Sequence, residues 1–262
     1  MSTPLRSPTA SVTKTSITSS LIVELRRLTR SGLGLGVLMA FAFFGLSSPV
    51  LAIYMPEILG AAASSDQLTI AASQATPADA ISLFNQSAMQ LGLIVTVAVA
   101  ITSIGWDTRP GSSIFYRTRA RRLSTVLLPR LIVDWLIALA TYSCGLLLAV
   151  VVTASAIGHP PAGVVVRTWV ACGLYIVMAM SIGHLLAASL RRTTTAIALT
   201  TLLVLVLPVM NQVPGTSRWA PTALLLPAGL HAMPVVAALV VTGLCAVGSV
   251  LIARRQMLRR DA

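Results

Sequence analysis

Charged residues are scarce in this chain, and lysine is almost absent. Only 10% of the 262 residues are Asp, Glu, Lys or Arg, whereas 56% are hydrophobic. Soluble domains carry about 25% charged residues, so this composition excludes an ordinary soluble fold. The single lysine, Lys14, does not end a glycine-rich phosphate-binding loop. The chain therefore cannot hydrolyse ATP through a P-loop.

Cysteine and histidine are also few, with 3 residues of each type. The cysteines, Cys144, Cys172 and Cys245, lie inside apolar stretches and show neither a disulfide framework nor zinc-site spacing. The histidines lack the HExxH spacing of a metalloprotease. We therefore expect a protein that is not an enzyme and that holds no catalytic residue, metal or cofactor of its own.

Six long apolar stretches account for about half of the chain. They cover about 33–54, 88–106, 131–157, 168–190, 193–210 and 230–253. About 20 apolar residues in a helix span the hydrocarbon core of a bilayer. Strand-like alternation is missing, and lipid offers the backbone no hydrogen-bond partners, so a helical bundle is the expected fold. The sequence predicts an all-α integral membrane protein with six transmembrane helices.

Basic residues mark alternate sides of these stretches. Seventeen of the nineteen Lys and Arg residues lie before the first stretch, between the second and third, between the fourth and fifth, or after the sixth. The other two, Arg167 and Arg218, lie in the opposite set of loops. Because positive charge is retained in the cytoplasm, this pattern predicts a multi-pass protein of the cell inner (plasma) membrane with both termini cytoplasmic. The net charge of +12 then reflects contact with membrane lipids, and we expect no nucleic-acid partner.

The N-terminal region divides into two parts. Residues 1–16 are rich in Ser, Thr and Pro and are expected to form a disordered cytoplasmic tail. Residues 17–31 are expected to form an amphipathic interfacial helix, after which 32–258 form the six-helix transmembrane domain. At 100° per residue an apolar arc, Ile17, Leu21, Leu25 and Leu28, lies opposite the basic side chains Arg26, Arg27 and Arg30.

Three ionisable residues near the membrane raise questions of pairing. Glu24 lies at the edge of the apolar arc, where it pairs either with Arg27 at i+3 or with an arginine of the 117–122 cluster. Asp134, one turn into the third stretch, is expected to pair locally with Arg130. His184, within the fourth stretch, is expected to bond to a neighbouring helix rather than to carry protons.

Three connections between the stretches are long. Residues 107–130 form the one long cytoplasmic loop, in which Ser112 or Ser113 can cap a short basic helix after Pro110-Gly111. Residues 55–87 are expected to form an acidic outer loop. Residues 211–229, which contain three prolines, are expected to form an outer re-entrant or interfacial segment.

The order of these parts resembles the membrane subunit of a type-2 ABC exporter (ABC type-2 permease), especially the actinobacterial drug- or antibiotic-export kind. The resemblance covers residues 17–258. It is carried by the interfacial helix sequence Leu21-Ile-Val-Glu-Leu-Arg-Arg-Leu28 and by the basic segment Gly111-Ser-Ser-Ile-Phe-Tyr-Arg-Thr-Arg-Ala-Arg-Arg-Leu123. The proline-rich stretch after the fifth apolar stretch adds to it.

The resemblance implies a division of labour between subunits. Two permease chains, identical or paralogous, would surround a central path, and two ABC ATPase subunits would bind ATP and Mg below them. The basic segment would be the coupling helix, with Ile114 and Phe115 as apolar anchors and with four arginines that steer and pair, namely Arg117, Arg119, Arg121 and Arg122. Charge that merely sets topology is the competing interpretation of this basic run.

The resemblance also places the path along the second and fifth spans. Both spans are apolar with hydroxyl side chains: Thr96, Thr102, Ser103, Thr200 and Thr201. An uncharged path suits an amphiphilic or lipophilic cargo, such as a drug, antibiotic, peptide or lipid, better than a small ion.

Two other functions fit the same composition. One is a secondary transporter or channel that works without an ATPase. The other is a non-transport membrane protein, such as an immunity or assembly scaffold. Co-purification of an ATPase would distinguish the ABC exporter subunit from these two alternatives.

Overall fold

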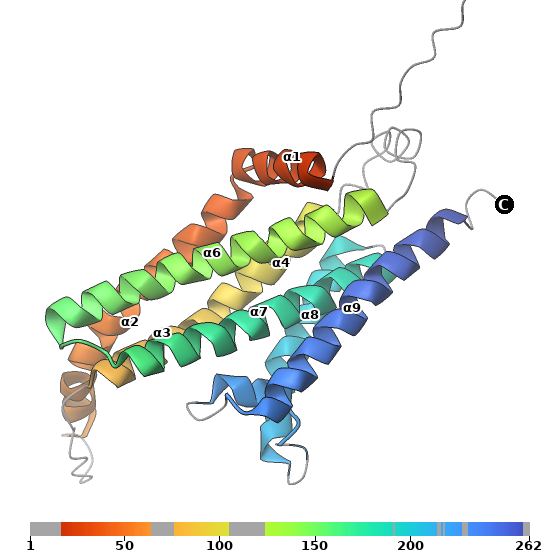
Figure 1. The fold of residues 1–262 in the computed structure, drawn as a ribbon. Coiled ribbons are helices and arrows are strands. Elements are labelled where there is room, and N and C mark those ends of the chain that lie inside the picture. The colour runs from red at the N-terminus through yellow and green to blue at the C-terminus, as the bar shows by residue number, and fades with distance from the viewer. Residues whose placement is uncertain are drawn as a thin grey trace, which may run out of the picture.

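A computed structural model describes residues 17–63, 76–104, 124–190, 192–213, 216, 218–226 and 230–258. Within these ranges every regular element is a helix (Figure 1). The elements are α1 (Ile17–Arg30), α2 (Leu33–Ala63), α3 (Pro77–Ser87), the π-helix η1 (Ala88–Gly92), α4 (Leu93–Ile104), α6 (Ser124–Ala156), α7 (Ala162–Leu190), α8 (Thr193–Val206), the 3₁₀ turns η3 (Leu207–Gln212) and η4 (Pro221–Leu225), and α9 (Ala232–Leu258).

Six helices are long and apolar enough to cross a membrane, which confirms the predicted number. They cover Leu33–Met55, Pro77–Ser103, Leu128–Ala156, Ala162–Leu190, Thr193–Gln212 and Ala232–Ala253. The second begins earlier than predicted, because Thr76 and Asp79 form a capping box at its N-terminus. From there α3, η1 and α4 run on as one span.

The prediction of a long outer loop over residues 55–87 is therefore wrong in its extent. α2 continues to Ala63 and α3 begins at Pro77, so Glu57 lies on α2 and Asp79 on α3. Asp66 lies outside the described residues. The sequence favoured a loop because acidic and proline residues interrupt the apolar pattern, but a proline in the first turn is compatible with a helix.

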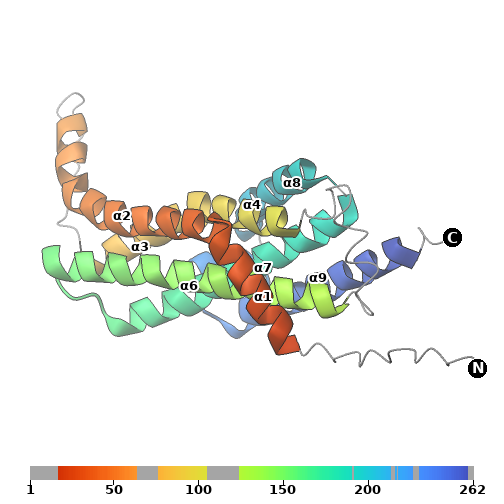
Figure 2. The same cartoon turned by 90° about the horizontal axis from the view of Figure 1, so that it is seen from above.

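α7 lies at the centre of the bundle and is the most buried span, whereas α8 is the least buried. α1 and the C-terminal end of α9 lie at the same end of the bundle (Figure 1). Seen from above, α1 lies across α6, close to the start of α2 (Figure 2). We refer to the end where α1 lies as the α1 end.

The tightest crossing joins α2 to α6 and depends on glycine. Gly45 faces the backbone oxygen of Gly145, and a Cβ on Gly145 would lie 2.7 Å from the backbone oxygen of Phe41. Small residues let membrane helices approach until their backbones touch. The same Phe41 ring covers Gly92 of η1, so three spans meet at this phenylalanine.

An aromatic cluster lies beside this crossing. The Tyr142 ring on α6 stacks on Phe84 at a centroid distance of 5.9 Å and meets Phe41 edge-on at 5.6 Å. Its hydroxyl donates to Asn85 Oδ1 over 3.0 Å. This bond ties α6 to α3 just before the π-helix.

Removing the Tyr142 hydroxyl tests how much this hydrogen bond stabilises the fold. We expect Tyr142→Phe to lower the free energy of unfolding in detergent by about 1–2 kcal/mol, because the Asn85 oxygen loses its donor. Tyr54→Phe on α2 is the matched control, since Tyr54 is exposed. Equal unfolding transitions for the two variants would show that the bond does not stabilise the fold.

The expected outer segment 211–229 contains only a short 3₁₀ turn beyond η3 among its described residues. Pro221 starts the 3₁₀ turn η4, which ends at Leu225, and Leu226 is already extended. A residue that precedes a proline is driven to extended geometry, and Pro227 follows. Thr222 is buried and donates to Asn211 Oδ1 over 2.8 Å, so η4 folds back beside the end of η3.

Candidate functional site

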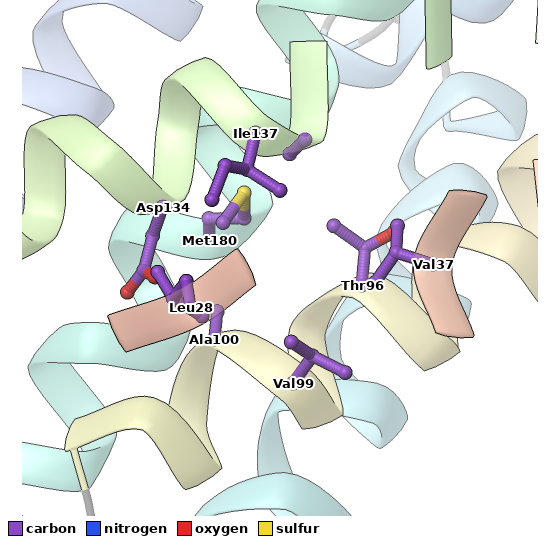
Figure 3. A pocket seen from close by; sticks show the side chains of 9 residues that line it. Leu28, Val37, Thr96, Val99, Ala100, Asp134, Ile137 and Met180 are labelled. Atoms are coloured by element: carbon purple, nitrogen blue, oxygen red, sulfur yellow. The ribbon is translucent and has the colours of Figure 1, made fainter. Parts of the chain in front are cut away.

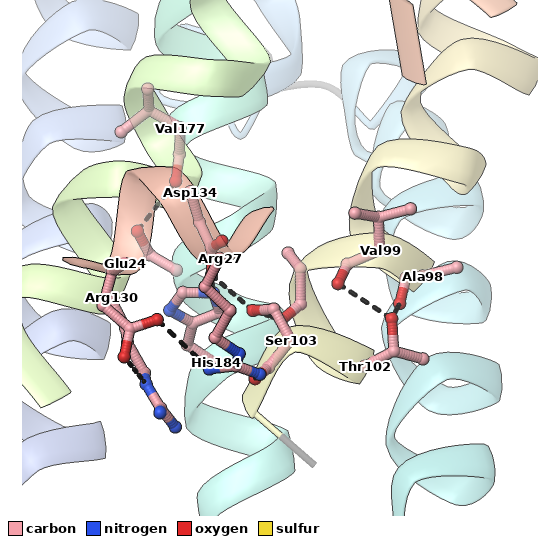
Figure 4. Close-up of polar contacts among 12 residues, drawn as sticks. Glu24, Arg27, Ala98, Val99, Thr102, Ser103, Arg130, Asp134, Val177 and His184 are labelled. Atoms are coloured by element: carbon pink, nitrogen blue, oxygen red, sulfur yellow. Dashed lines mark hydrogen bonds and ion pairs between the residues drawn. The ribbon is translucent and has the colours of Figure 1, made fainter. Parts of the chain in front are cut away.

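Charged and polar side chains from α1, α4, α6 and α7 meet at the α1 end of the bundle (Figure 4). Glu24 of α1 is central to one half of this group. Its Oε1 accepts a hydrogen bond from Arg130 Nε of α6 over 2.8 Å, and its Oε2 lies 3.1 Å from Arg27 Nη1. Glu24 is 8% exposed and Arg130 is 3% exposed, so the pair between α1 and α6 is buried.

The other half of the group joins α4 to α6 and α7. Ser103, in the last turn of α4, donates to Asp134 Oδ2 over 2.8 Å. His184 Nε2 of α7 lies 3.3 Å from the same carboxylate oxygen, without the alignment of a hydrogen bond. Arg27 connects the two halves, because its Nη2 donates to the backbone oxygen of Ser103 over 2.9 Å. We call Glu24, Arg27, Ser103, Arg130, Asp134 and His184 the polar cluster.

α1 turns one of its sides toward the bundle. Glu24 and Leu28 face the bundle and are buried, whereas Leu25 of the expected apolar arc is 46% exposed. A buried carboxylate needs partners in low dielectric, and Arg27 and Arg130 supply them. The local pair of Glu24 with Arg27 is confirmed. Its tertiary partner within the described residues is Arg130, which lies outside the 117–122 cluster.

The predicted local pair between Asp134 and Arg130 is wrong for the part of the chain that the structure describes. Arg130 directs its Nε across to α1, and Asp134 contacts Ser103 and His184 instead. His184 contacts the neighbouring helix α6 through Asp134, but its Nε2 does not form the hydrogen bond that the sequence predicted. With two carboxylates and two guanidinium groups, the polar cluster is electrically neutral when the imidazole is neutral.

A small cavity lies beside the polar cluster (Figure 3). Its volume is about 10 Å³, and its walls include Leu28, Thr96, Asp134 and Met180. Such a volume holds about one water molecule. It is far too small for a cargo, so this cavity inside the single chain is not a transport path.

Comparison with protein-family models, with curated proteins and with solved structures finds no match to this chain. The interpretation of the site therefore rests on its own geometry.

The predicted path residues occupy different environments. Thr96 and Thr200 are buried within the chain, and each donates its hydroxyl to a carbonyl of its own helix. Ser103 is buried in the polar cluster. Thr102 is exposed on α4, and Thr201 is half-buried on α8. Only Thr102 among these five thus lies on the open surface of the chain.

The predicted coupling residues lie outside the described residues: Ile114, Phe115, Arg117, Arg119, Arg121 and Arg122. Arg26, assigned to the interfacial helix, is exposed on α1. The helices on both sides of the segment that holds the predicted coupling residues nevertheless contribute to the polar cluster. α4, which ends at Ile104, carries Ser103, and α6, which begins at Ser124, carries Arg130 and Asp134.

Sequence reasoning missed two features of the structure. The first is the identity of the long-range partner of Glu24, Arg130, for which Glu24 at the edge of an apolar arc was the available signal. The second is a set of exposed polar side chains on the second span, Ser82, Gln86 and Gln90. Their regular spacing of four residues is visible in the sequence, but the earlier start of this span is not.

Proposed function

We propose that this chain is the membrane-spanning permease subunit of an ATP-driven type-2 ABC exporter, with ATP hydrolysis in a separate subunit. The observation that carries the proposal is the polar cluster. It joins four helices at one end of the bundle, and two of these helices border the basic segment that resembles a coupling helix.

The connections suggest how a partner would move the chain. Ser103 lies at the end of α4, and Arg130 and Asp134 lie in the first turns of α6. A protein that displaces residues 105–123 therefore pulls on both helices. Buried ion pairs resist separation, so α1 moves with α6. The hydrogen bond of Ser103 to Asp134 and the contact of His184 with Asp134 join α4 and α7 to the same body.

The same end of the bundle is cytoplasmic in this proposal. The basic residues of the sequence gather at the ends of the spans that meet there, as the positive-inside rule requires. α1 then lies at the inner surface of the plasma membrane. Two copies, or one copy and a paralogue, form the path for an amphiphilic or lipophilic cargo.

Association with an ATPase tests the proposal. The chain is tagged, purified from membranes of its own host and analysed for a subunit with Walker motifs whose ATP hydrolysis depends on the chain. The double variant Ile114→Asp with Phe115→Asp is expected to reduce this association at least about tenfold, because an apolar anchor is lost. Ile22→Asp with Val23→Asp, on the exposed face of α1, is the matched control. Cargo transport that proceeds without any ATPase would contradict the proposal.

One observation favours a second function, secondary transport driven by protons. Asp134 and His184 form a buried pair at a membrane end, and buried ionisable groups in spans often lie on proton paths. Reconstituted vesicles distinguish the two functions. A proton carrier moves cargo with a pH gradient and no ATP, and Asp134→Asn is expected to abolish that transport. An exporter moves cargo only with ATP and its ATPase.

A further inference from the structure

The outward face of the second span is unusually polar. Its exposed residues between Pro77 and Ser103 are Asp79, Ser82, Gln86, Gln90, Leu91, Val95 and Thr102. In α9, by contrast, every exposed residue between Ala232 and Ala253 is apolar. A face turned to lipid has the composition of α9, so the second span faces something else. We call Ser82, Gln86 and Gln90 the amide stripe.

Gln90 gives the strongest evidence that this face of the second span is not covered by lipid. It is the middle residue of the Pro77–Ser103 span, where a bilayer is driest. Among the described residues, neither its side-chain amide nor that of Gln86 has a hydrogen-bond partner. An amide without partners in hydrocarbon costs roughly 4–8 kcal/mol. Two such amides on one face would strongly destabilise insertion if lipid covered them.

The backbone at this position is also irregular. Gln90 lies in the π-helix η1, Ala88–Gly92, and single π-turns within α-helices occur frequently at functional sites. The wider turn keeps Gln90 and Leu91 exposed while Ala88, Met89 and Gly92 remain buried. Gly92 permits this, because the Phe41 ring lies where its side chain would be.

We propose that the amide stripe lines a water-filled translocation path, in which it hydrogen-bonds an uncharged, amphiphilic cargo. This inference rests on the proposed function, because it assumes that the chain transports a cargo. Gln86 and Gln90 offer donors and acceptors without formal charge, and Leu91 and Val95 supply apolar surface beside them. The matching cargo carries hydroxyl or amide groups on an apolar body. The amide stripe takes over the role that the sequence predicted for Thr96, Ser103 and Thr200, because these three side chains are buried inside the chain.

Thiol labelling in intact membranes tests the proposal. Exposed Cys144 and half-buried Cys245 are first replaced by Ala, and buried Cys172 is kept. Gln86→Cys and Gln90→Cys are then treated with a charged methanethiosulfonate that does not cross membranes. Leu244→Cys is the matched control, because Leu244 is 69% exposed near the middle of α9. Only a thiolate in water reacts, so we expect the two stripe variants to react at least about tenfold faster than the control.

The labelling rates decide whether the amide stripe lies in water. Rates for both stripe variants equal to that of Leu244→Cys overturn the proposal. So does an oxidative cross-link between two Gln90→Cys chains in the absence of labelling, because it shows dry contact between copies. If Gln90→Cys does not insert, the rate for Gln86→Cys decides alone.

The labelling result is independent of the ATPase experiment. Fast labelling without an associated ATPase leaves a path but removes the ABC exporter. Slow labelling with an ATPase present leaves the exporter and removes the amide stripe from its path.

Discussion

Gly145→Leu is expected to leave little folded protein in the membrane. A Cβ at this position would lie 2.7 Å from the backbone oxygen of Phe41 and 2.8 Å from its Cβ. Backbone atoms of α2 cannot rotate away as a side chain tip can, so α2 and α6 must separate. We expect the free energy of unfolding to fall by at least about 3 kcal/mol, the upper part of the range for overpacked cores.

The control for this prediction is Gly243→Leu on α9. Nothing lies within 4 Å of a Cβ built on Gly243, so the larger side chain meets open space. Its effect is expected to stay within about 0.5 kcal/mol. Thermal unfolding in detergent, followed by fluorescence-detected gel filtration, measures both variants. Similar melting of the two would mean that the close crossing of α2 and α6 does not hold the bundle together.

The second large effect is expected at the polar cluster. Glu24→Gln leaves the buried Arg130 guanidinium without its carboxylate on α1, and the loss of one partner of a buried ion pair costs about 3–5 kcal/mol. We expect lower stability and release of α1 from α6. Trypsin then cuts faster after Arg26 and Arg30, which are exposed on α1.

A double-mutant cycle isolates the interaction. Arg130→Met removes the other partner, and the double variant is expected to cost about 2 kcal/mol less than the sum of the single variants. Glu57→Gln is the control, because Glu57 is exposed on α2. Additive effects would show that Glu24 and Arg130 act separately and that the cluster does not join α1 to the bundle.

The six apolar helices could be predicted from hydropathy along the chain. Each span needs about 20 apolar residues in an unbroken run, and that requirement is local in sequence. Such runs gave the number of spans and most of their ends. They failed at Pro77, where a capping box of Thr76 and Asp79 begins a helix outside the apolar pattern. Caps depend on a few atoms, which hydropathy does not measure.

The candidate site could be predicted only in part. The pairing of Glu24 with Arg27 follows from helical spacing, because residues three apart lie on neighbouring positions of one helix. The partner of Arg130 does not follow, since Glu24 is more than a hundred residues away and reaches it only when α1 lies across α6. The roles of Ile114 and Phe115 stay predictions.

Hydrophobicity by itself determined that this chain forms six helices long and apolar enough to cross a membrane, because that property is local to each segment. The tertiary structure alone decided which polar side chains are enclosed and which are exposed. Glu24 became buried and Gln90 was left on the surface because helix packing rotates each span about its axis. That rotation depends on contacts such as those of Gly145 with Phe41, between residues far apart in the chain.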